Sequence, residues 1–391
     1  MRDPLVTIVT PSFNQAEFIE ATIESVLAQD YPHIEYIVVD GGSSDGTAAI
    51  VAGYAGRLQW ISEPDRGQTH AINKGFQRAR GEIVAWLNSD DLLMPGAVSA
   101  AVEAFGRSPE TGAVYGDGLC IDRHGAVTMP FPATAEFNLW RLAWLCDYIL
   151  QQATFFRRSA VEQVGWLDES LHWAMDWDIL TRLGKRFGLP YLARDLGCLR
   201  EYGETKTASG GAARFGELRA LLRRQTGSRW APGCWYYGLD TYDKIWGEAI
   251  RRCGTGPLRP AAERLANLVV QACRRKIDLT ALHSQGYYSG GWAARRMHWM
   301  LPRGHGPVEI TGELPEWIGP ASFLKVRSGR RVLHETVLQP GPFEWRFDAG
   351  DAPDALTLRF DASRAVRGPR GSGAPEGIPV AWRLYSIGWV R

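Results

Sequence analysis

The chain has 391 residues, which is more than one typical hydrophobic core accommodates and predicts two or three domains. Its 45% hydrophobic and 22% charged residues are typical of a globular protein, and a net charge of +1 excludes a general attraction to nucleic acid. Because no run of about 18 or more apolar residues occurs, the sequence predicts no membrane span, and its first residues lack the apolar core of a signal peptide.

The first ninety residues alternate between short apolar runs and segments with helical spacing. Runs rich in β-branched residues predict buried strands, and apolar residues at intervals of three and four predict helices. The predicted strands are 5–10, 36–39, 58–61 and 83–87. The predicted helices are 15–28, one that opens at Gly46, and 67–80. This alternation predicts parallel strands joined by helical crossovers in an α/β domain.

The next segment is more mixed. We expect strands at 113–115 and 153–156, and a helix that begins near Asp178 and carries Leu180 and Leu183. The first domain is expected to span residues 1–210.

Residues 211–304 are predicted to form a helical connector. Its part from 244 to 303 carries eleven Lys and Arg residues against three acids. A solvated basic face explains this excess; the alternative is peripheral contact with an anionic membrane surface or a diphosphate-lipid acceptor. We expect no nucleic-acid partner, because no recognition module is visible.

From residue 305 to 391 the pattern changes to a period of two. Short alternating runs between Gly and Pro turns predict a small accessory β-sandwich. The expected strands include 323–327, 343–347, 356–360 and 382–387. We expect this domain to pack against the rest of the chain or to form a homo-oligomer, with glycan binding as the alternative.

The six cysteines contain no CxxC pair, which disfavours a zinc site. They are typical of free thiols in a reducing compartment. The predicted location is therefore the cytoplasm, with the inner face of the membrane as a further expectation.

Four polar motifs in the first half follow a predicted strand or open a helix. They are Pro11-Ser12-Phe13-Asn14, the run from Asp40 to Thr47, Asn88-Ser89-Asp90-Asp91, and Met175-Asp176-Trp177-Asp178. Open α/β sheets bind ligands at the carboxyl ends of their strands. Adjacent carboxylates suit Mg²⁺ or Mn²⁺, which prefer hard oxygen ligands; the alternative for the acidic pair is capping of a helix after Pro95.

In this order the motifs resemble those of GT-A fold glycosyltransferases of family 2, which are inverting enzymes. The resemblance covers roughly residues 5–207. It implies a Rossmann-like nucleotide-binding domain, a nucleoside diphosphate sugar donor with UDP as the first choice, and Mn²⁺ or Mg²⁺ as the cofactor.

The resemblance also implies roles for single residues. Asp40 resembles the acid that hydrogen-bonds the base, and Asp90 is the first choice for a metal ligand, with Asp91 as the second choice or as a helix cap. The residues expected to bind the nucleotide sugar are Pro11, Ser12, Phe13, Asn14, Asp40, Gly42, Ser43, Arg66, Asn73, Lys74, Asn88, Ser89, Arg200 and Lys206. The family often has Asp where this chain has Asn88, and an amide oxygen still accepts a hydrogen bond.

Asp176 resembles the catalytic base of the family, and Met175 replaces a common neighbouring acid. A site closed by aromatic side chains is expected to raise the pKa of Asp176, which helps a carboxylate to act near neutrality. Asp178 is interpreted as the N-cap of the helix that follows.

The residues expected to bind the acceptor are Gln151, Trp173 and Trp177. The loop 200–207 resembles one that closes over the diphosphate, where Arg200 and Lys206 are expected to meet phosphate oxygens. Tyr202 stands where the family commonly has His.

The sequence therefore predicts an inverting, metal-dependent hexosyl- or N-acetylhexosaminyltransferase. It would move a sugar to a hydroxyl of a saccharide or lipid-linked glycan in bacterial surface polysaccharide biosynthesis. The alternative is a non-catalytic glycan-binding or scaffold protein, which Asn88 and Tyr202 favour. A nucleotidyltransferase is a weaker option, because the expected Gly-rich phosphate loop is missing.

Overall fold

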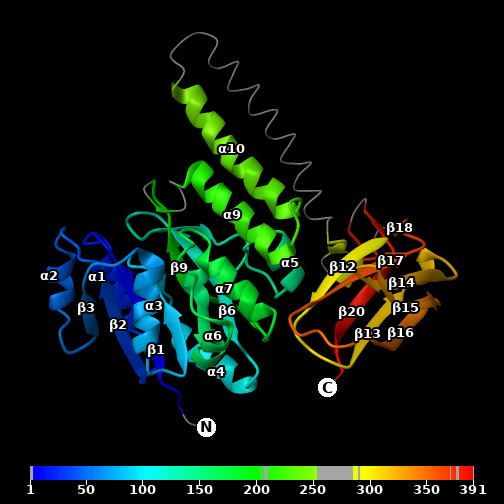
Figure 1. The fold of residues 1–391 in the computed structure, drawn as a ribbon, viewed down its shortest axis with the longest axis horizontal. Coiled ribbons are helices and arrows are strands. Elements are labelled where there is room, and N and C mark those ends of the chain that lie inside the picture. The colour runs from blue at the N-terminus through cyan, green and yellow to red at the C-terminus, as the bar shows by residue number, and fades with distance from the viewer. Residues whose placement is uncertain are drawn as a thin grey trace. The chain divides into compact units, whose positions relative to one another are not determined.

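A computed structural model describes residues 3–203, 205–206, 210–252, 285–288, 291–369, 371–375 and 378–390. The chain divides into two compact units, which we describe separately (Figure 1). The first comprises Met1–Phe137 and Asp147–Leu221, and the second Asn138–Cys146 and Leu222–Arg391. Among the described residues, no helix has both the length and the apolar composition that crossing a bilayer requires.

The first unit is built on a mixed nine-stranded sheet. Its strands are β1 (Val6–Ser12), β2 (Ile34–Asp40), β3 (Gln59–Ser62), β4 (Ile83–Trp86), β5 (Leu92–Leu93), β6 (Ala113–Ile121), β7 (Val127–Pro130), β8 (Thr154–Arg157) and β9 (Tyr191–Arg200). The order is β3-β2-β1-β4-β8-β6-β9-β5, with β7 beside β6. The pairs β1–β2, β1–β4 and β2–β3 are parallel, as predicted. The strand order reverses at β1, and such a reversal opens a ligand crevice in α/β sheets.

Strand β1 continues two residues beyond the predicted end at Thr10, through Pro11 and Ser12. Proline cannot donate to a neighbouring strand, which usually excludes it from central strands. It is tolerated here because the pairing of β1 with β4 stops at Val9, while the pairing with β2 continues to Ser12.

Helices cover both faces of this sheet. They are α1 (Ile19–Leu27), α2 (Thr47–Ala52), α3 (Gln68–Arg78), α4 (Ala97–Arg107), α6 (Arg158–Val164) and α7 (Met175–Gly184), with a 3₁₀ turn η1 (Gln151–Ala153). Successive strand residues face opposite sides. Ile8 lies in a core cluster with Ile23 of α1 and Val98 of α4. Val9 faces α3, where a Cβ on Gly75 would lie 2.3 Å from its Cγ1, so glycine allows α3 to approach the sheet closely.

The helix cap predicted at Asp178, and the cap considered as the alternative for the acidic pair, are both wrong. The N-cap of α4 is Gly96 and that of α7 is Ala174, and neither makes a side-chain capping bond. The acidic pair is followed by β5, which pairs with β9 and separates Asp91 from α4. Helix α7 begins before Asp178, whose carboxylate instead lies 2.7 Å from Nε of Arg182, one turn later.

The helices α5 (Leu139–Trp144), α9 (Gly211–Thr226) and α10 (Pro232–Arg252) complete the helical part. Residues 253–284 lie outside the described residues. Most of the predicted basic connector, and the membrane contact expected of it, therefore falls outside the described part of the chain.

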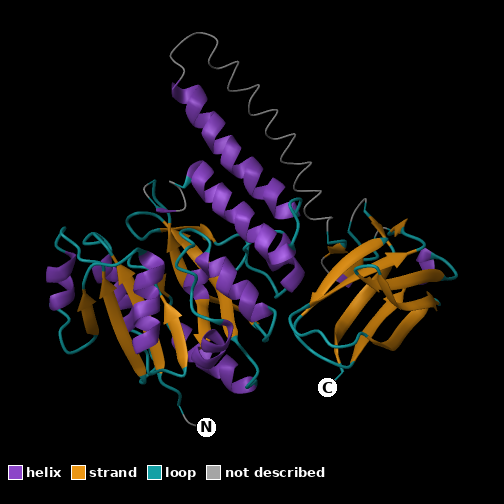
Figure 2. Cartoon of the chain, viewed as in Figure 1, coloured by secondary structure: helices purple, strands orange, loops and turns teal. Residues whose placement is uncertain are grey.

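The described part of the second unit contains two large antiparallel sheets and a two-stranded one (Figure 2). Its strands are β10 (Tyr287–Tyr288), β11 (Trp292–Ala293), β12 (Arg296–Leu301), β13 (Pro307–Leu314), β14 (Ser322–Ser328), β15 (Arg331–Leu338), β16 (Gly341–Asp348), β17 (Leu356–Ala362), β18 (Val366–Arg367), β19 (Pro379–Val380) and β20 (Trp382–Trp389), with a 3₁₀ turn η3 (Glu316–Ile318). One sheet has the order β10-β11-β20-β13-β16, the other β12-β17-β14-β15, and β18 pairs with β19. Ile310 and Trp382 of the first sheet share a core with Leu324 and Phe360 of the second, which confirms a β-sandwich.

The strands of the β-sandwich begin before residue 305, where the sequence predicted the start of this domain. Helix was expected up to residue 304, but β12 is a strand that pairs with β17 from Arg296 to Leu301. Its Met297 and Leu301 are buried in the sandwich core. The basic residues around position 296 obscure the pattern in the sequence, and the partner strand, far along the chain, determines the conformation.

Candidate functional site

The loop that follows β1 is tied to the loop that follows β2. The backbone N of Asn14 donates to Oγ of Ser43 at 2.8 Å, and its Oδ1 accepts from the backbone N of Ser44 at 2.9 Å. Asn14 adopts a left-handed conformation with φ 54°, which Asn tolerates better than most residues. Phe13 beside it is 60% exposed, so its ring is available to a ligand.

Asp40, the last residue of β2, is fully buried and organises this loop pair. It lies next to Ser12 in the parallel register. Its carboxylate accepts from the backbone N of Gly42 at 3.2 Å and of Ser43 at 3.1 Å, and from the hydroxyls of Ser43 and Ser62. The residues predicted to surround the base are therefore brought together, with Asp40 held by four protein donors.

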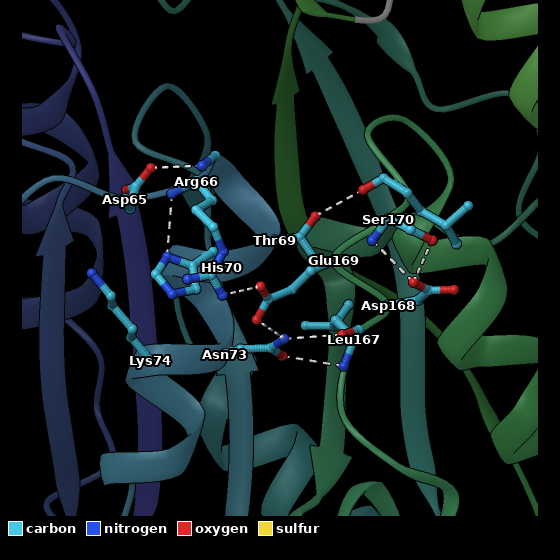
Figure 3. Close-up of polar contacts among 12 residues, drawn as sticks. Asp65, Arg66, Thr69, His70, Asn73, Lys74, Leu167, Asp168, Glu169 and Ser170 are labelled. Atoms are coloured by element: carbon cyan, nitrogen blue, oxygen red, sulfur yellow. Dashed lines mark hydrogen bonds and ion pairs between the residues drawn. The ribbon is translucent and has the colours of Figure 1, made fainter.

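The start of α3 is bound to the loop 167–170 (Figure 3). Nη2 of Arg66 lies 2.5 Å from Oε2 of Glu169, and this hydrogen bond lowers the pKa of Glu169. The buried amide of Asn73 donates to the carbonyl of Leu167 at 2.9 Å and to Glu169 at 3.2 Å, and accepts from the backbone N of Leu167 at 3.1 Å. Asn73, predicted to flank the donor, therefore holds this loop.

Lys74 points away from the Glu169 contacts in Figure 3. Its Nζ lies 2.9 Å from Oε1 of Glu63 and donates to the carbonyl of Pro64 at 3.3 Å. Arg66 and Lys74, both predicted to contact the donor, are thus ion-paired within the protein.

Asp91, the last residue of the loop between β4 and β5, is buried and heavily hydrogen-bonded. It accepts from Nδ2 of Asn88 at 2.9 Å, from Nε2 of Gln152 at 2.6 Å and from the backbone N of Arg200 at 2.8 Å. Burial raises its pKa, with a further contribution from the charge of Asp90. Asp91 therefore connects β4, η1 and β9 rather than facing a ligand.

Asp90 is half-buried and has a different environment. The hydroxyl of Tyr202 donates to its Oδ2 at 2.9 Å, and burial raises its pKa. The neighbouring Ser89 is buried. No group of three or more His, Cys, Asp or Glu side chains that could hold a metal occurs within the described ranges. A metal bound here would depend on Asp90 together with oxygens that a ligand or water supplies.

Arg200 does not lie where the sequence predicted. Its side chain is buried: Nε donates to the carbonyl of Asp90 at 2.7 Å, and Nη1 to the carbonyls of Asp122 and Arg123 at 3.1 and 3.0 Å. The guanidinium also lies 5.1 Å from the ring centre of Phe18. This position fixes the backbone of the acidic pair and leaves the guanidinium little access to a diphosphate.

A chain of hydrogen bonds joins the motif Asn88-Ser89-Asp90-Asp91 to the start of α3 and to the loop 200–207. Nζ of Lys206 donates to Oε1 of Gln68 at 2.8 Å, and Nε2 of Gln68 donates to Oδ1 of Asn88 at 2.7 Å. Asn88 in turn donates to Asp91. Gln68 was missed in the sequence, because a glutamine at the start of a helix gives no signal by itself.

Asp176 lies in the first turn of α7 and is half-buried, and this burial raises its pKa. The segment before it is fixed by Glu217 of α9. The carboxylate of Glu217 accepts from the backbone N of His172, Trp173 and Ala174 at 2.8, 2.7 and 2.9 Å. Glu217 was not predicted as a site residue either, because it lies on a different helix, far along the chain from the motif that it supports.

Three further ionisable groups influence Asp176. Burial, and then the charge of Asp176, raises the pKa of Asp147 well above its usual value. The positive charges of Lys206 and Arg214 favour the ionised form of Asp176. Burial lowers the pKa of Lys206 to about 8, against the opposing effect of Asp176. The two aspartates therefore bind protons at a higher pH than two independent carboxylates would.

Two of the residues predicted to bind the acceptor are buried. Trp177 is 1% exposed and packs in the core, and Gln151 is buried with its amide donating to the carbonyl of Trp86 at 2.8 Å. Trp173 is half-buried, and its Nε1 donates to the carbonyl of Lys206 at 3.1 Å. Of the three, only Trp173 lies next to the proposed base with part of its surface exposed.

Comparison with known families gives a match to the first unit. The family model described as Glycosyl transferase family 2 matches residues 7–165. An uncharacterized glycosyltransferase of Mycobacterium tuberculosis is 34% identical over 186 residues, which is 46% of this chain and 68% of that protein. A putative teichuronic acid biosynthesis glycosyltransferase, TuaG of Bacillus subtilis, is 45% identical over 92 residues, or 22% of this chain and 36% of TuaG.

Solved structures with a similar fold include residues 1–349 of S. aureus TarS in complex with UDP-GlcNAc. That chain has 15% identity and a TM-score of 0.47, with 73% of this chain and 93% of TarS 1–349 covered. A mannosyltransferase from Pyrobaculum calidifontis, in complex with GDP-Man and Mn²⁺, has 22% identity and a TM-score of 0.41 over 73% of this chain and 75% of that one.

Proposed function

This chain belongs to glycosyl transferase family 2, and from that membership we propose that it is an inverting, metal-dependent enzyme. In this proposal it transfers a hexosyl or N-acetylhexosaminyl group from a nucleoside diphosphate sugar, with UDP as the first candidate. The acceptor is a hydroxyl of a saccharide or lipid-linked glycan of a bacterial surface polysaccharide.

The observation that carries the proposal is the hydrogen-bonded chain from Asp91 through Asn88 and Gln68 to Lys206. It connects the loop after β4, the start of α3 and the loop 200–207. The charge of Lys206 in turn acts on Asp176 in α7. Residues that a sugar transfer needs on the donor side are thereby linked to the candidate base on the acceptor side.

Asp176 acts as the general base in this mechanism. Its carboxylate takes the proton from the acceptor hydroxyl, whose oxygen then bonds to the anomeric carbon from the face opposite the leaving nucleoside diphosphate. Burial, and then the charge of Asp176, raises the pKa of Asp147 well above its usual value, so the ionised carboxylate of the pair is assigned to Asp176, beside Lys206. The three hydrogen bonds to Glu217 fix the backbone that precedes Asp176, which orients the base toward the hydroxyl.

The residues near Asp90 fit a divalent cation. Mg²⁺ and Mn²⁺ are commonly held by one or two carboxylates together with substrate phosphates, and Asp90 offers a half-buried carboxylate in the loop between β4 and β5. When bound, such a cation would neutralise charge that develops on the departing diphosphate. The hydroxyl of Tyr202 donates to Asp90 and would help to hold that carboxylate in place for such a cation.

The test of this function is donor turnover by the purified full chain. UDP-, dTDP-, GDP- and CDP-sugars are incubated with Mn²⁺, and released nucleoside diphosphate is measured with and without an oligosaccharide acceptor. One nucleotide is expected to be released faster than the others, and EDTA is expected to abolish its release. If no donor is bound or turned over under any condition, the proposal is wrong and a non-catalytic role is favoured.

Replacing Glu217 with Ala is expected to displace the backbone segment before Asp176 and so to impair Asp176 as the base. Three N–H groups lose their acceptor, which should lower the free energy of unfolding by about 1–3 kcal/mol. Displacement of Asp176 should lower kcat by about 10- to 100-fold, with the KM for the donor little changed. Steady-state kinetics and thermal melting measure both effects.

Arg219→Ala, an exposed change on the same helix, is the matched control and should behave as wild type. If Glu217→Ala is destabilised but keeps its kcat, Glu217 has a structural role only.

A further inference from the structure

The β-sandwich of the second unit contains an open cavity of about 760 Å³. It lies where β12 begins and β17 ends, next to the ribbon of β18 and β19. Its lining includes Tyr288, Arg295, Arg296, Ser363, Arg364 and Ile378. This volume falls within the range of about 300–1,000 Å³ that is typical of small-molecule sites.

The three arginines give the cavity a positive charge. In the described part of the chain, no carboxylate lies within 4.0 Å of Arg295 or Arg364. Arg296 lies 3.3 Å from Asp361, but Asp361 also lies 2.8 Å from Arg359 and 3.9 Å from Arg327. One carboxylate shared among three guanidinium groups cannot neutralise them all, so the cavity retains net positive charge.

Two of these arginines are held in place by the backbone around them. A Cβ on Gly319 would lie 1.9 Å from Nη1 of Arg364, so the arginine occupies the space that the glycine leaves open. Ser363 beside it exchanges two hydrogen bonds with Phe323 of β14, at 2.8 and 2.9 Å. Nε of Arg295 donates to the carbonyl of Ala362 at 3.3 Å, which leaves its terminal nitrogens for a ligand.

The remaining lining suits a sugar ring. Tyr288 lines the cavity, and an aromatic ring offers an apolar surface on which a sugar ring can pack. Ile378 adds apolar surface beside it. Arginine pairs with carboxylate and phosphate through two parallel hydrogen bonds, and both groups occur on acidic saccharides.

From this arrangement we infer that the β-sandwich cavity binds an anionic saccharide, through a carboxylate or phosphate held by Arg295 and Arg364. The inference deepens the proposed function, on which its choice of a saccharide rests: the glycan that the enzyme extends or recognises carries negative charge. The cavity then serves as a glycan-binding site separate from the residues proposed for transfer.

Binding to the full chain by isothermal titration tests this inference. The probes are oligogalacturonate, which carries carboxylates, a glycerol-phosphate oligomer, and a maltooligosaccharide of equal length as the neutral reference. The wild type is expected to bind one of the two anionic probes and not the neutral one. Arg364→Glu and Arg295→Glu are each expected to weaken that binding by at least about 10-fold, since each removes a charge-assisted contact.

Arg330→Glu makes the same charge change in the exposed turn between β14 and β15, outside the cavity, and should bind as wild type. Equal binding of the neutral probe, equal loss in Arg330→Glu, binding to neither anionic probe, or binding only to phosphatidylglycerol vesicles would each overturn the inference. Unchanged thermal melting and unchanged nucleotide binding show that the variants are folded.

Donor turnover is measured in the same samples, which separates the two proposals. A chain that turns over a donor but binds no anionic saccharide contradicts this inference alone. A chain that binds the anionic probe through Arg364 but turns over no donor contradicts the transferase proposal alone, and leaves the cavity assignment standing.

Discussion

Asp176→Asn is expected to lower kcat by about 10²- to 10⁴-fold, because an amide cannot accept the proton of the acceptor hydroxyl. Nucleotide binding should be preserved, since the donor residues lie in other loops. The substitution also removes a half-buried negative charge whose ionised form burial disfavours, so the variant should fold at least as well as wild type. Acceptor-dependent release of nucleoside diphosphate, with nucleotide affinity measured separately, provides the test.

The pH profile of the wild type gives an independent readout. A base must be ionised to act, and burial raises the pKa of Asp176, so kcat/KM should fall as the pH decreases through that raised pKa. The pKa of Lys206 is about 8, so an alkaline decline near that pH is expected if its charge supports the diphosphate. Asp195→Asn, an exposed change in β9, is the control. Comparable kcat in Asp176→Asn and wild type would remove Asp176 from the role of base.

Asp90→Ala is expected to abolish the effect of Mn²⁺ on nucleotide binding. Stabilisation by a ligand at 100 times its dissociation constant amounts to about 2.7 kcal/mol, so the loss of metal-linked affinity is readily seen in thermal melting. Turnover should fall by about 100-fold or more, since a bound cation contributes several kcal/mol to transition-state stabilisation. Melting curves with UDP and the other nucleotides, each with and without Mn²⁺, measure the change.

Glu103→Ala is a suitable comparison, because Glu103 is an exposed acid on α4 that pairs with Arg107 one turn away. It should keep the full Mn²⁺ response. A Mn²⁺ response that survives in Asp90→Ala would place the cation elsewhere, and would leave Asp90 as a structural partner of Tyr202.

The alternation of strands and helices in the first unit could be predicted because it is encoded locally. Each buried strand is a short β-branched run, and each helix carries apolar residues at intervals that form one face. Because the strands could be predicted from these local patterns, the motif residues could be predicted to follow them. It also contained a signal that was overlooked: Trp177 shares helical spacing with Leu180, a buried residue, and so lies on the core face of α7.

Contacts between distant segments could not be predicted in this way. Tyr202 meets Asp90 across 112 residues, and Lys206 meets Gln68 across 138. A tyrosine in place of histidine suggested a weakened site when read alone. In the structure its hydroxyl reaches the carboxylate, so the substitution retains a polar contact with Asp90.

The support that Glu217 gives to the segment before Asp176 bears on how this protein can change over evolution. The helix that carries Glu217 follows the 7–165 segment recognised as the family domain, yet the backbone of the proposed base depends on it. A recombinant that exchanges the C-terminal half keeps this backbone support only if the junction falls after Glu217, within the first unit, which ends at Leu221. The structural unit around the proposed base therefore extends beyond the segment that the family model recognises.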